Sequence, residues 1–329
     1  MNWHKLLDVV GSGRIFIQTH DYPDPDAIAS AFGLQTFLAH FGINSLLCYK
    51  GDMDRLSVTT AVETFNVSIF PFSDALMMQP GDKIILVDGQ KYNANMTDLP
   101  GHIVACIDHH PIIKQPSYEY ADLRIVGSCS SILADYFFTA HVPMPKNVAT
   151  MLLFGLHIDT KFLTRGVKEL DLTIFPELYR LADQNQLELI ENCNLELADL
   201  KAFGVAFNTI TIFGRAGFAH IPFSCHDALI AQVADFILSL AEVDIAIVYA
   251  SRPDGLKYSV RSAMTNVHSG DMLVATMPPF GSGGGHASMA GGFVARKTIE
   301  QNGIKEDDVA IILRDRFLHY IHERLKTPS

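Results

Sequence analysis

Acidic and histidine side chains follow four apolar stretches of this 329-residue chain, close to the point where each stretch ends. The stretches are 15–19, 83–87, 103–107 and 147–158. The residues that follow them are His20, Asp24, Asp26, Asp88, Asp108, His109, His110 and Asp159. Carboxylates and imidazoles without thiolates suit Mn²⁺, or Mg²⁺ where imidazole is limited, better than a structural zinc site. So many acids in one pocket would repel one another unless cations neutralised them, which favours two divalent ions.

Single members of this set have ordinary structural explanations. An aspartate at a strand end is most often an N-cap or a turn residue, and Asp26 could be only the cap of the helix that it opens. Asp21 and Asp98 fit no wider pattern, and we interpret them as turn residues. The same placement in four stretches favours a metal centre over four separate caps.

The elements that would position these side chains form an α/β pattern. Short apolar stretches at 14–19, 45–50, 83–88 and 103–108 are typical of buried strands, and residues 26–42 have apolar side chains at helical spacing. Further helices are predicted at 129–140, 147–159 and 171–184. This order predicts a mostly parallel sheet with flanking helices. Ligands of such sheets bind outside the carboxyl ends of the strands, where most of these acids are expected.

A second pattern begins near residue 205. Strands are expected at 216–223, 244–250 and 256–262, a helix at 226–240, and a closing helix from about residue 305, after a glycine-rich segment. We predict one domain over 1–195 and a smaller α/β domain over 205–329.

Composition argues against several classes of protein. A formal net charge of −11 makes the chain a poor candidate for gripping long duplex nucleic acid through a broad basic surface. No stretch approaches the ~18 apolar residues of a membrane span. Five singly scattered cysteines and an N-terminus without signal-peptide features predict a cytoplasmic protein.

Taken in order, these motifs resemble those of the DHH phosphoesterase superfamily. The triplet is Asp108-His109-His110 in "CIDHHP", and the first motif, His-x-x-x-Asp-x-Asp, is "HDYPDPDAIAS". The second is the aspartate of "ILVDGQ", and the fourth is that of "GLHIDTKFLTRG". The C-terminal half resembles the associated substrate-binding domain through Arg261-Ser262 and "GSGGGH". Ala29 stands where many members have glycine, a change from which we expect little effect.

The resemblance implies a ligand set for two divalent ions, with Mn²⁺ expected first and Mg²⁺ or Co²⁺ as alternatives. The first ion would be held by His20, Asp24 and Asp88. The second would be held by Asp26, Asp88, His109 and Asp159. Asp88 would bridge the ions, Asp108 would orient the ligands from behind, and His110 would face the substrate phosphate.

The same resemblance implies phosphate-binding residues in the second domain. They are Arg261, Ser262, Gly283, Gly284, Gly285 and His286. Arg165, just after the fourth motif, is a further candidate that a surface salt bridge would explain equally well. Glycines leave backbone N–H groups open to a phosphate, although a flexible glycine turn is the plain alternative. No Gly-Lys-Ser/Thr follows, so the segment is not a P-loop.

Phosphate sites in both domains predict an active site in the cleft between them. We predict hydrolysis of short oligonucleotides (nanoRNA, linear dinucleotides) or 3′-phosphoadenosine 5′-phosphate, by attack of a metal-bridging hydroxide with His110 and Asp108 as catalytic residues. Hydrolysis of phosphoanhydrides, as by exopolyphosphatases or inorganic pyrophosphatases, and of cyclic dinucleotides are the alternatives. A nucleotide sensor with an inactive metal site is the alternative from another class. Whether the chain forms a homodimer is left open.

Overall fold

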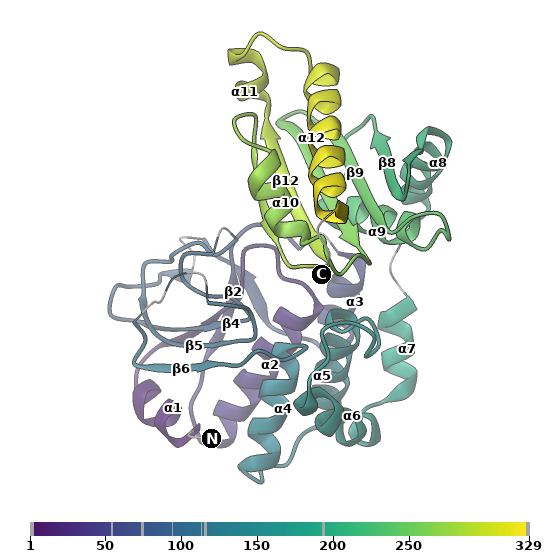
Figure 1. Cartoon of the computed structure of the whole chain (residues 1–329). Helices are drawn as coiled ribbons and strands as arrows, with labels where there is room; N and C mark the ends of the chain where they lie inside the picture. Colours follow the sequence, from purple (N-terminus) through teal and green to yellow (C-terminus); the bar gives the residue numbers. More distant parts are fainter. Residues whose placement is uncertain are drawn as a thin grey trace. The chain divides into compact units, whose positions relative to one another are not determined.

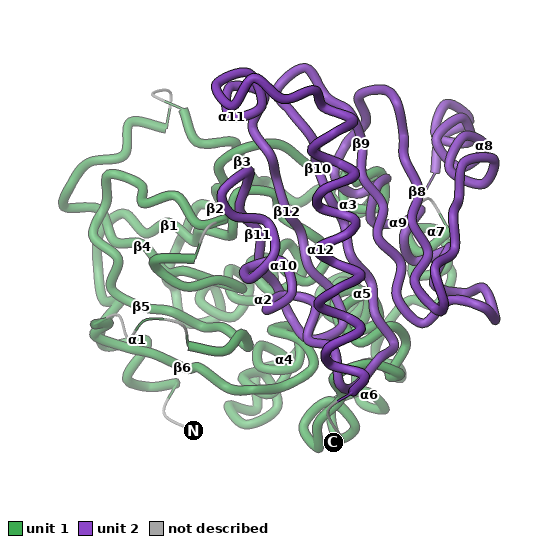
Figure 2. Tube along the Cα trace, turned by 45° about the horizontal axis from the view of Figure 1, so that its top comes forward, with its two compact units in different colours: residues 1–194 green, residues 195–329 purple. Residues whose placement is uncertain are grey.

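The computed structural model describes residues 3–53, 55–73, 76–93, 95–112, 114, 117–192 and 195–326. The chain divides into two compact units, residues 1–194 and 195–329 (Figures 1 and 2). The predicted roles of the two domains, and the predicted active site between them, stay predictions.

In the described part of unit 1, six parallel strands form one sheet in the order β3-β2-β1-β4-β5-β6. The strands are β1 (Ile15–Gln18), β2 (Leu46–Tyr49), β3 (Ile69–Pro71), β4 (Lys83–Val87), β5 (His102–Asp108) and β6 (Tyr120–Leu123). The predicted mostly parallel sheet is confirmed, and the edge strands β3 and β6 are additions to it. The strand order reverses beside β1, which has β2 on one side and β4 on the other. A ligand crevice is expected at such a switch point, outside the carboxyl ends of β1 and β4.

Helices cover one face of this sheet (Figure 1). They are α1 (Trp3–Val10), α2 (Pro25–His40), α3 (Leu56–Thr64), α4 (Cys129–Thr139), α5 (Lys146–Asp159), α6 (Glu169–Leu181) and α7 (Gln184–Asn192). Phe37 of α2 packs edge-on against Tyr136 and Phe137 of α4, with ring centroids 5.5 Å apart in both pairs. On the other face, strand side chains such as Phe16 pack against Met78 and Met96 from loops. The buried helices α2, α4 and α5 therefore form a rigid support beside the carboxyl edge of the sheet.

Unit 2 is built on a second sheet, in the order β11-β12-β10-β9-β8-β7 among its described residues. The strands are β7 (Thr211–Phe213), β8 (Ala216–Ile221), β9 (Ile245–Arg252), β10 (Gly255–Ser262), β11 (Ser282–Gly285) and β12 (Met289–Ala295). The helices are α8 (Leu200–Thr209), α9 (Asp227–Leu238), α10 (Ser269–Thr276), α11 (Arg296–Gln301) and α12 (Glu306–Lys326), with a 3₁₀ turn, η2 (Leu197–Asp199). Helices α8 and α9 pack on one face, and α10 and α12 on the other. The predicted second α/β domain is confirmed as a fold.

None of the described helices combines the length and the apolar character needed to cross a membrane.

Candidate metal centre

The loop after β1 places two side chains of the first motif at the switch point. Asp24, rather than Asp26, caps helix α2: its Oδ1 accepts hydrogen bonds from the backbone N–H groups of Asp26 at 3.0 Å and Ala27 at 3.1 Å. Pro25 at the first helical position has no N–H to satisfy, which suits that place. His20 Nε2 lies 3.9 Å from Asp24 Oδ1. The helix-capping role that we considered for Asp26 therefore belongs to Asp24, two residues earlier.

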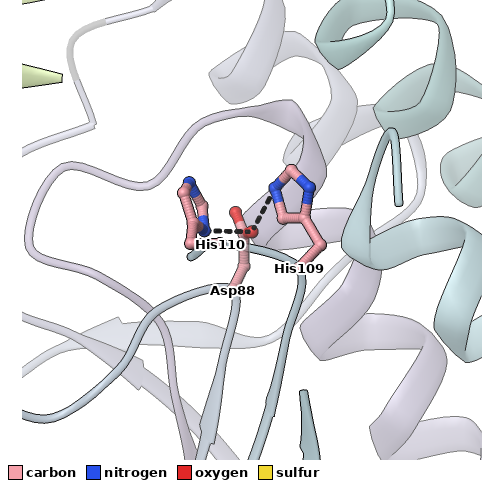
Figure 3. Close-up of side chains that lie close together, drawn as sticks. All are labelled: Asp88, His109 and His110. Atoms are coloured by element: carbon pink, nitrogen blue, oxygen red, sulfur yellow. Dashed lines mark ion pairs between the residues drawn. The ribbon is translucent and has the colours of Figure 1, made fainter. Parts of the chain in front are cut away.

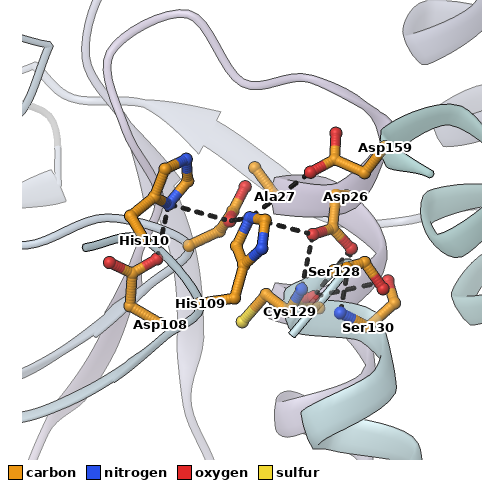
Figure 4. Close-up of polar contacts among 12 residues, drawn as sticks. Asp26, Ala27, Asp108, His109, His110, Ser128, Cys129, Ser130 and Asp159 are labelled. Atoms are coloured by element: carbon orange, nitrogen blue, oxygen red, sulfur yellow. Dashed lines mark hydrogen bonds and ion pairs between the residues drawn. The ribbon is translucent and has the colours of Figure 1, made fainter. Parts of the chain in front are cut away.

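Asp26 lies inside the protein, where two helices meet α2 (Figure 4). Its carboxylate accepts hydrogen bonds from the backbone N–H groups of Cys129 at 2.6 Å and Ser130 at 2.9 Å, at the N-terminus of α4. A helix N-terminus favours negative charge, so α4 fixes this carboxylate and stabilises its ionised form. Gly155 of α5 lies so close that an added Cβ would be 3.0 Å from the Asp26 Cα.

Asp88 follows β4 and lies between the two other groups of ligands. Its Oδ2 is 3.8 Å from His20 Nε2. Its Oδ1 is 3.3 Å from His109 Nε2, a contact that Figure 3 shows. The residue is 2% exposed and has a φ of +57°, a left-handed conformation that costs a non-glycine residue free energy. The strained backbone turns the carboxylate so that each oxygen faces a different group of side chains.

His109 joins the second group through one defined ring nitrogen. Its Nδ1 is 3.0 Å from the backbone carbonyl of Val126, so Nδ1 carries the proton and donates it. The lone pair of Nε2 is then left for the carboxylates, with Asp159 Oδ2 at 3.3 Å. Fixing the distal nitrogen in this way is typical of histidines that bind metals. Asp159 reaches this point from the last residue of α5, a helix rather than a strand.

Asp108 and His110 form a separate hydrogen-bonded pair beside these groups (Figure 4). His110 Nδ1 lies 2.8 Å from Asp108 Oδ1, and Gln90 Nε2 donates to Asp108 Oδ2 at 2.8 Å. The same amide donates to the backbone carbonyl of His110 at 3.0 Å. Asp108 thus orients His110, whereas the resemblance led us to expect it behind the metal ligands.

Burial and proximity together shift the pKa values of the carboxylates. Burial raises the pKa of Asp26 well above its usual range, and the charges of Asp88 and Asp159 raise it further. Burial likewise raises the pKa of Asp88, which the nearby histidines offset only in part. For Asp24, the interaction with His20 outweighs the effect of burial and lowers the pKa, and the hydrogen bond with His110 does the same for Asp108. Two buried carboxylates that resist ionisation indicate that positive charge is needed between them.

The histidine pKa values shift in the complementary direction. Burial would lower the pKa of His109, but the carboxylates of Asp159 and Asp88 outweigh it and raise that pKa well above the usual value. For His110 the hydrogen bond to Asp108 likewise outweighs burial and raises the pKa to about 9. The carboxylates around His109 and His110 therefore favour positive charge at both rings.

The donor atoms fit divalent cations. Groups whose ligand atoms all lie within 4.8 Å of one another are His20 with Asp24 and Asp88, Asp26 with His109 and Asp159, and Asp88 with His109 and His110. The first two are the sets that the resemblance implied, joined by the bridging carboxylate. Asp88 Oδ1 and His109 Nε2 are buried and make no hydrogen bond within the described chain, which fits atoms that can bind a cation. Oxygen and imidazole donors without sulfur suit Mn²⁺ or Mg²⁺.

The arginines predicted to bind phosphate are held by other groups in this structure. Arg261 Nε lies 3.1 Å from Asp235 Oδ2, and the same guanidinium donates to Ser259 Oγ at 3.2 Å. Arg165 donates to the backbone carbonyl of Asp159 at 2.9 Å and therefore caps the end of α5. Its contact supports the backbone of a predicted metal ligand, and phosphate binding by either arginine stays a prediction.

Gly283, Gly284 and Gly285 of "GSGGGH" belong to the edge strand β11, whereas the plain alternative to phosphate binding was a flexible turn. Gly283 and Gly284 pair with Gly292 and Gly291 of β12. The turn that follows is anchored to β10 by the Ser262 N–H, which donates to the carbonyl of Ser288 at 2.8 Å. The turn is also anchored to α10, because the backbone N–H of Gly270 donates to the carbonyl of His286 at 3.1 Å. The Arg-Ser pair and the glycine segment thus meet at one end of the second sheet.

Sequence reasoning missed several residues that support the centre. Gln90, two positions after the second-motif aspartate, holds Asp108 and could have been suspected from that spacing. The carbonyl of Val126 and the backbone N–H of Cys129 act through the main chain, where side-chain type gives no signal. The role of Gly155 depends on how α5 packs against α2 and α4.

Parts of this chain are similar in sequence to known proteins. Residues 14–156 match the model of the DHH family, N-terminal domain. An uncharacterised protein of Methanocaldococcus jannaschii is 28% identical over 279 residues, which are 84% of this chain and 57% of that protein. A probable manganese-dependent inorganic pyrophosphatase of Streptococcus thermophilus is 27% identical over 176 residues, 52% of this chain and 56% of that protein. The chain thus spans little more than half the length of either relative.

Among solved structures, the chain resembles an exopolyphosphatase-related protein from Bacteroides fragilis. The TM-score is 0.77 at 16% sequence identity, and the match covers 98% of this chain and 97% of that one. At this identity the likeness shows a shared fold.

Proposed function

We propose, from the premise that residues 14–156 belong to the DHH family as its N-terminal domain, that this protein is a metal-dependent hydrolase of phosphate esters or anhydrides. The observation that carries the proposal is Asp88, whose two oxygens face two different groups of buried nitrogen and oxygen donors. Two divalent cations bound there would polarise a phosphoryl oxygen and acidify a water molecule.

The protein's own residues have distinct roles in this proposal. His20, Asp24 and Asp88 hold one cation, and Asp26, Asp88, His109 and Asp159 hold the other, with Mn²⁺ as the first choice and Mg²⁺ or Co²⁺ as alternatives. Asp108 fixes the ring of His110 through Nδ1, so that Nε2 can donate a hydrogen bond to a phosphate or protonate a leaving oxygen. The hydrogen bond to Asp108 raises the pKa of His110 to about 9, which favours the protonated form of the ring.

For the substrate we propose a short oligonucleotide or a small phosphorylated nucleotide. Near the glycine strand of unit 2, the cations of Lys257 and Arg261 are already engaged with carboxylates, Lys257 with Asp227 at 2.6 Å and Arg261 with Asp235 at 3.1 Å. A small, highly charged ligand would have to compete with these partners. A nucleotide, which carries less charge for its size, would depend less on them.

The second candidate is hydrolysis of inorganic pyrophosphate or polyphosphate. It is favoured by the similarity over 176 residues to a probable manganese-dependent inorganic pyrophosphatase. The two candidates share one metal centre and differ in what unit 2 must recognise.

A panel assay separates the candidates. Purified protein is incubated with a dinucleotide, 3′-phosphoadenosine 5′-phosphate, a cyclic dinucleotide, polyphosphate and pyrophosphate, each with Mn²⁺, Mg²⁺ or Co²⁺ and with EDTA as control. We expect mononucleotide or adenosine monophosphate to be released with Mn²⁺ and not with EDTA. Fast release of phosphate from pyrophosphate, with nucleotides left intact, would replace the first candidate by the second. Hydrolysis that persists in EDTA would contradict the metal centre itself.

A further inference from the structure

Unit 2 contains a second polar and aromatic pocket, at the β7 side of its sheet and away from the glycine strand β11. It has a volume of about 270 Å³, slightly below the range of about 300–1,000 Å³ usual for small-molecule sites. Strands β7 to β10 and helix α12 provide its lining. None of the residues that the family resemblance assigned lies in this lining.

The floor of the pocket is a row of parallel rings on three neighbouring strands. His220, Tyr249 and Tyr258 are opposite one another in the strand register of β8, β9 and β10. The first two rings are 4.4 Å apart with a 10° angle between their planes, and the second pair is 5.1 Å apart with a 20° angle. Phe213 at the edge is 37% exposed, and the Arg314 guanidinium lies over its ring, 5.2 Å from the centroid. Such surfaces favour a flat ring as the occupant.

Two polar groups in the lining lack a partner within the described chain. The Tyr258 hydroxyl is buried, on a residue that is 2% exposed, and makes no hydrogen bond there. A buried hydroxyl without a partner costs free energy, which a bound ligand would recover. Asp307, in the first turn of α12, adds an exposed carboxylate that can only accept hydrogen bonds at neutral pH. A ligand that satisfies both must carry N–H donors as well as a flat ring.

The charge around the pocket argues against a phosphate group in it. Glu306 and Asp307 both raise the pKa of Tyr249, to which burial contributes most, and that pKa reaches about 12. Arg314 is the cation in the lining, and its guanidinium is paired with Asp315 at 3.0 Å. The acidic surroundings favour a neutral or cationic ligand over an anion.

We propose that this pocket binds an amino-substituted nitrogen heterocycle of the size of a nucleobase or nucleoside, lying across the ring edges of the aromatic row in an edge-to-face arrangement and hydrogen-bonded to Tyr258 and Asp307. This site goes beyond the proposed hydrolase function and does not depend on it.

Binding of nucleosides to the full-length protein with Mn²⁺ tests the proposal. Calorimetry with adenosine and cytidine, which carry an amino group, is compared with purine riboside, whose base has no N–H donor. We expect adenosine or cytidine to bind and purine riboside to bind about tenfold more weakly than adenosine. Tyr258→Phe and Asp307→Asn should each weaken binding about tenfold, whereas Asp308→Asn, the same change one residue away, should leave it within about twofold.

A nucleoside could also enter the hydrolytic site, so Asp88→Asn is included. Binding that survives Asp88→Asn and is weakened by Tyr258→Phe supports the pocket. Tyr258→Phe removes only an unpaired hydroxyl, so this variant should fold as well as the parent, which thermal unfolding checks. The proposal is overturned if neither amino-bearing nucleoside binds, or if their binding is lost in Asp88→Asn and unchanged in Tyr258→Phe.

Discussion

Both units of this protein bury imidazole rings, and the two surroundings have opposite effects on them. In unit 1, His109 lies 3.3 Å from carboxylate oxygens of both Asp88 and Asp159, and its pKa is raised well above the usual value. In unit 2, His220 is stacked on a tyrosine, and burial lowers its pKa. Burial acts in the same direction on both rings, so the neighbouring carboxylates make the difference.

Different interactions hold the polar groups of the two sites. At the carboxyl edge of the first sheet, charged groups lie close together and largely buried, an arrangement that bound cations would stabilise. In the aromatic row, the rings themselves supply most of the contacts and one hydroxyl is left open. The first site should therefore respond strongly to changes of charge, and the second weakly.

The largest effect is expected for Asp88→Asn. Asparagine tolerates the left-handed backbone of this position, so the change removes the charge and one ligand oxygen while keeping the local conformation. We expect hydrolysis to fall by roughly 10³-fold or more, with loss of at least one bound Mn²⁺ per chain. Asp98→Asn, at an exposed residue in an ion pair with Lys91, is the control and should change activity little. Activity within tenfold of the parent in Asp88→Asn would refute the bridging role.

Gly155→Ala tests whether packing, as well as charge, holds the first site. The added Cβ would collide with Ser130 Oγ and approach the Asp26 Cα to 3.0 Å, and those are buried groups that cannot move freely. We expect a loss of about 1–3 kcal/mol in the free energy of unfolding, together with weaker Mn²⁺ binding. Gly33→Ala is the matched control, because its Cβ would meet only the end of the Leu152 side chain, at 3.1 Å. The free energies of unfolding are measured by urea denaturation. Equal losses in the two variants would show that the packing of Gly155 against Asp26 matters no more for stability than an ordinary core contact.

A smaller effect is expected for Asp108→Asn, because Asp108 acts through His110. Loss of the charge that orients and protonates the ring should lower kcat about 10- to 100-fold, while KM and Mn²⁺ affinity stay close to the parent values. Asp21→Asn is the control in the same unit, since the Asp21 carboxylate accepts hydrogen bonds from Thr97 in a neighbouring loop. A matching drop in Mn²⁺ affinity would instead place Asp108 behind the metal ligands, as first expected.

Much of the first site could be predicted from sequence, because strand ends and motif spacing determine where its side chains lie. A residue that follows a buried parallel strand lies at the carboxyl edge of the sheet. Asp88 directly follows β4, and His20 comes two residues after the end of β1. The parts of the site that could not be predicted act through the backbone, as Val126 does, or through packing between distant segments, as Gly155 does. No pattern of residue types records such contacts.

The second unit was harder to predict, for a related physical reason. Strand β7 is three residues long, and none of them is buried, so it lacks the alternation of buried and exposed side chains that identifies a strand. Strand β11 is nearly all glycine, which favours turns in isolation and is held here by pairing with β12. The aromatic row depends on the register of three strands, and single-sequence patterns do not fix register.

The smallest predicted effect concerns the pH dependence of stability at the aromatic row. Because burial lowers the pKa of His220 in the folded protein, the unfolded chain binds a proton more readily, and stability falls as the pH falls through the unfolded value of about 6.5. In His220→Gln this contribution disappears. The urea midpoint of the variant should therefore drop less than that of the parent between about pH 7.5 and pH 5.5. His319→Gln on α12, at an exposed position, controls for the loss of an imidazole as such. An identical pH dependence in parent and His220→Gln would mean that the surrounding acids, Asp307 and Glu306, cancel the effect of burial, and the contrast between the two units would then be one of degree only.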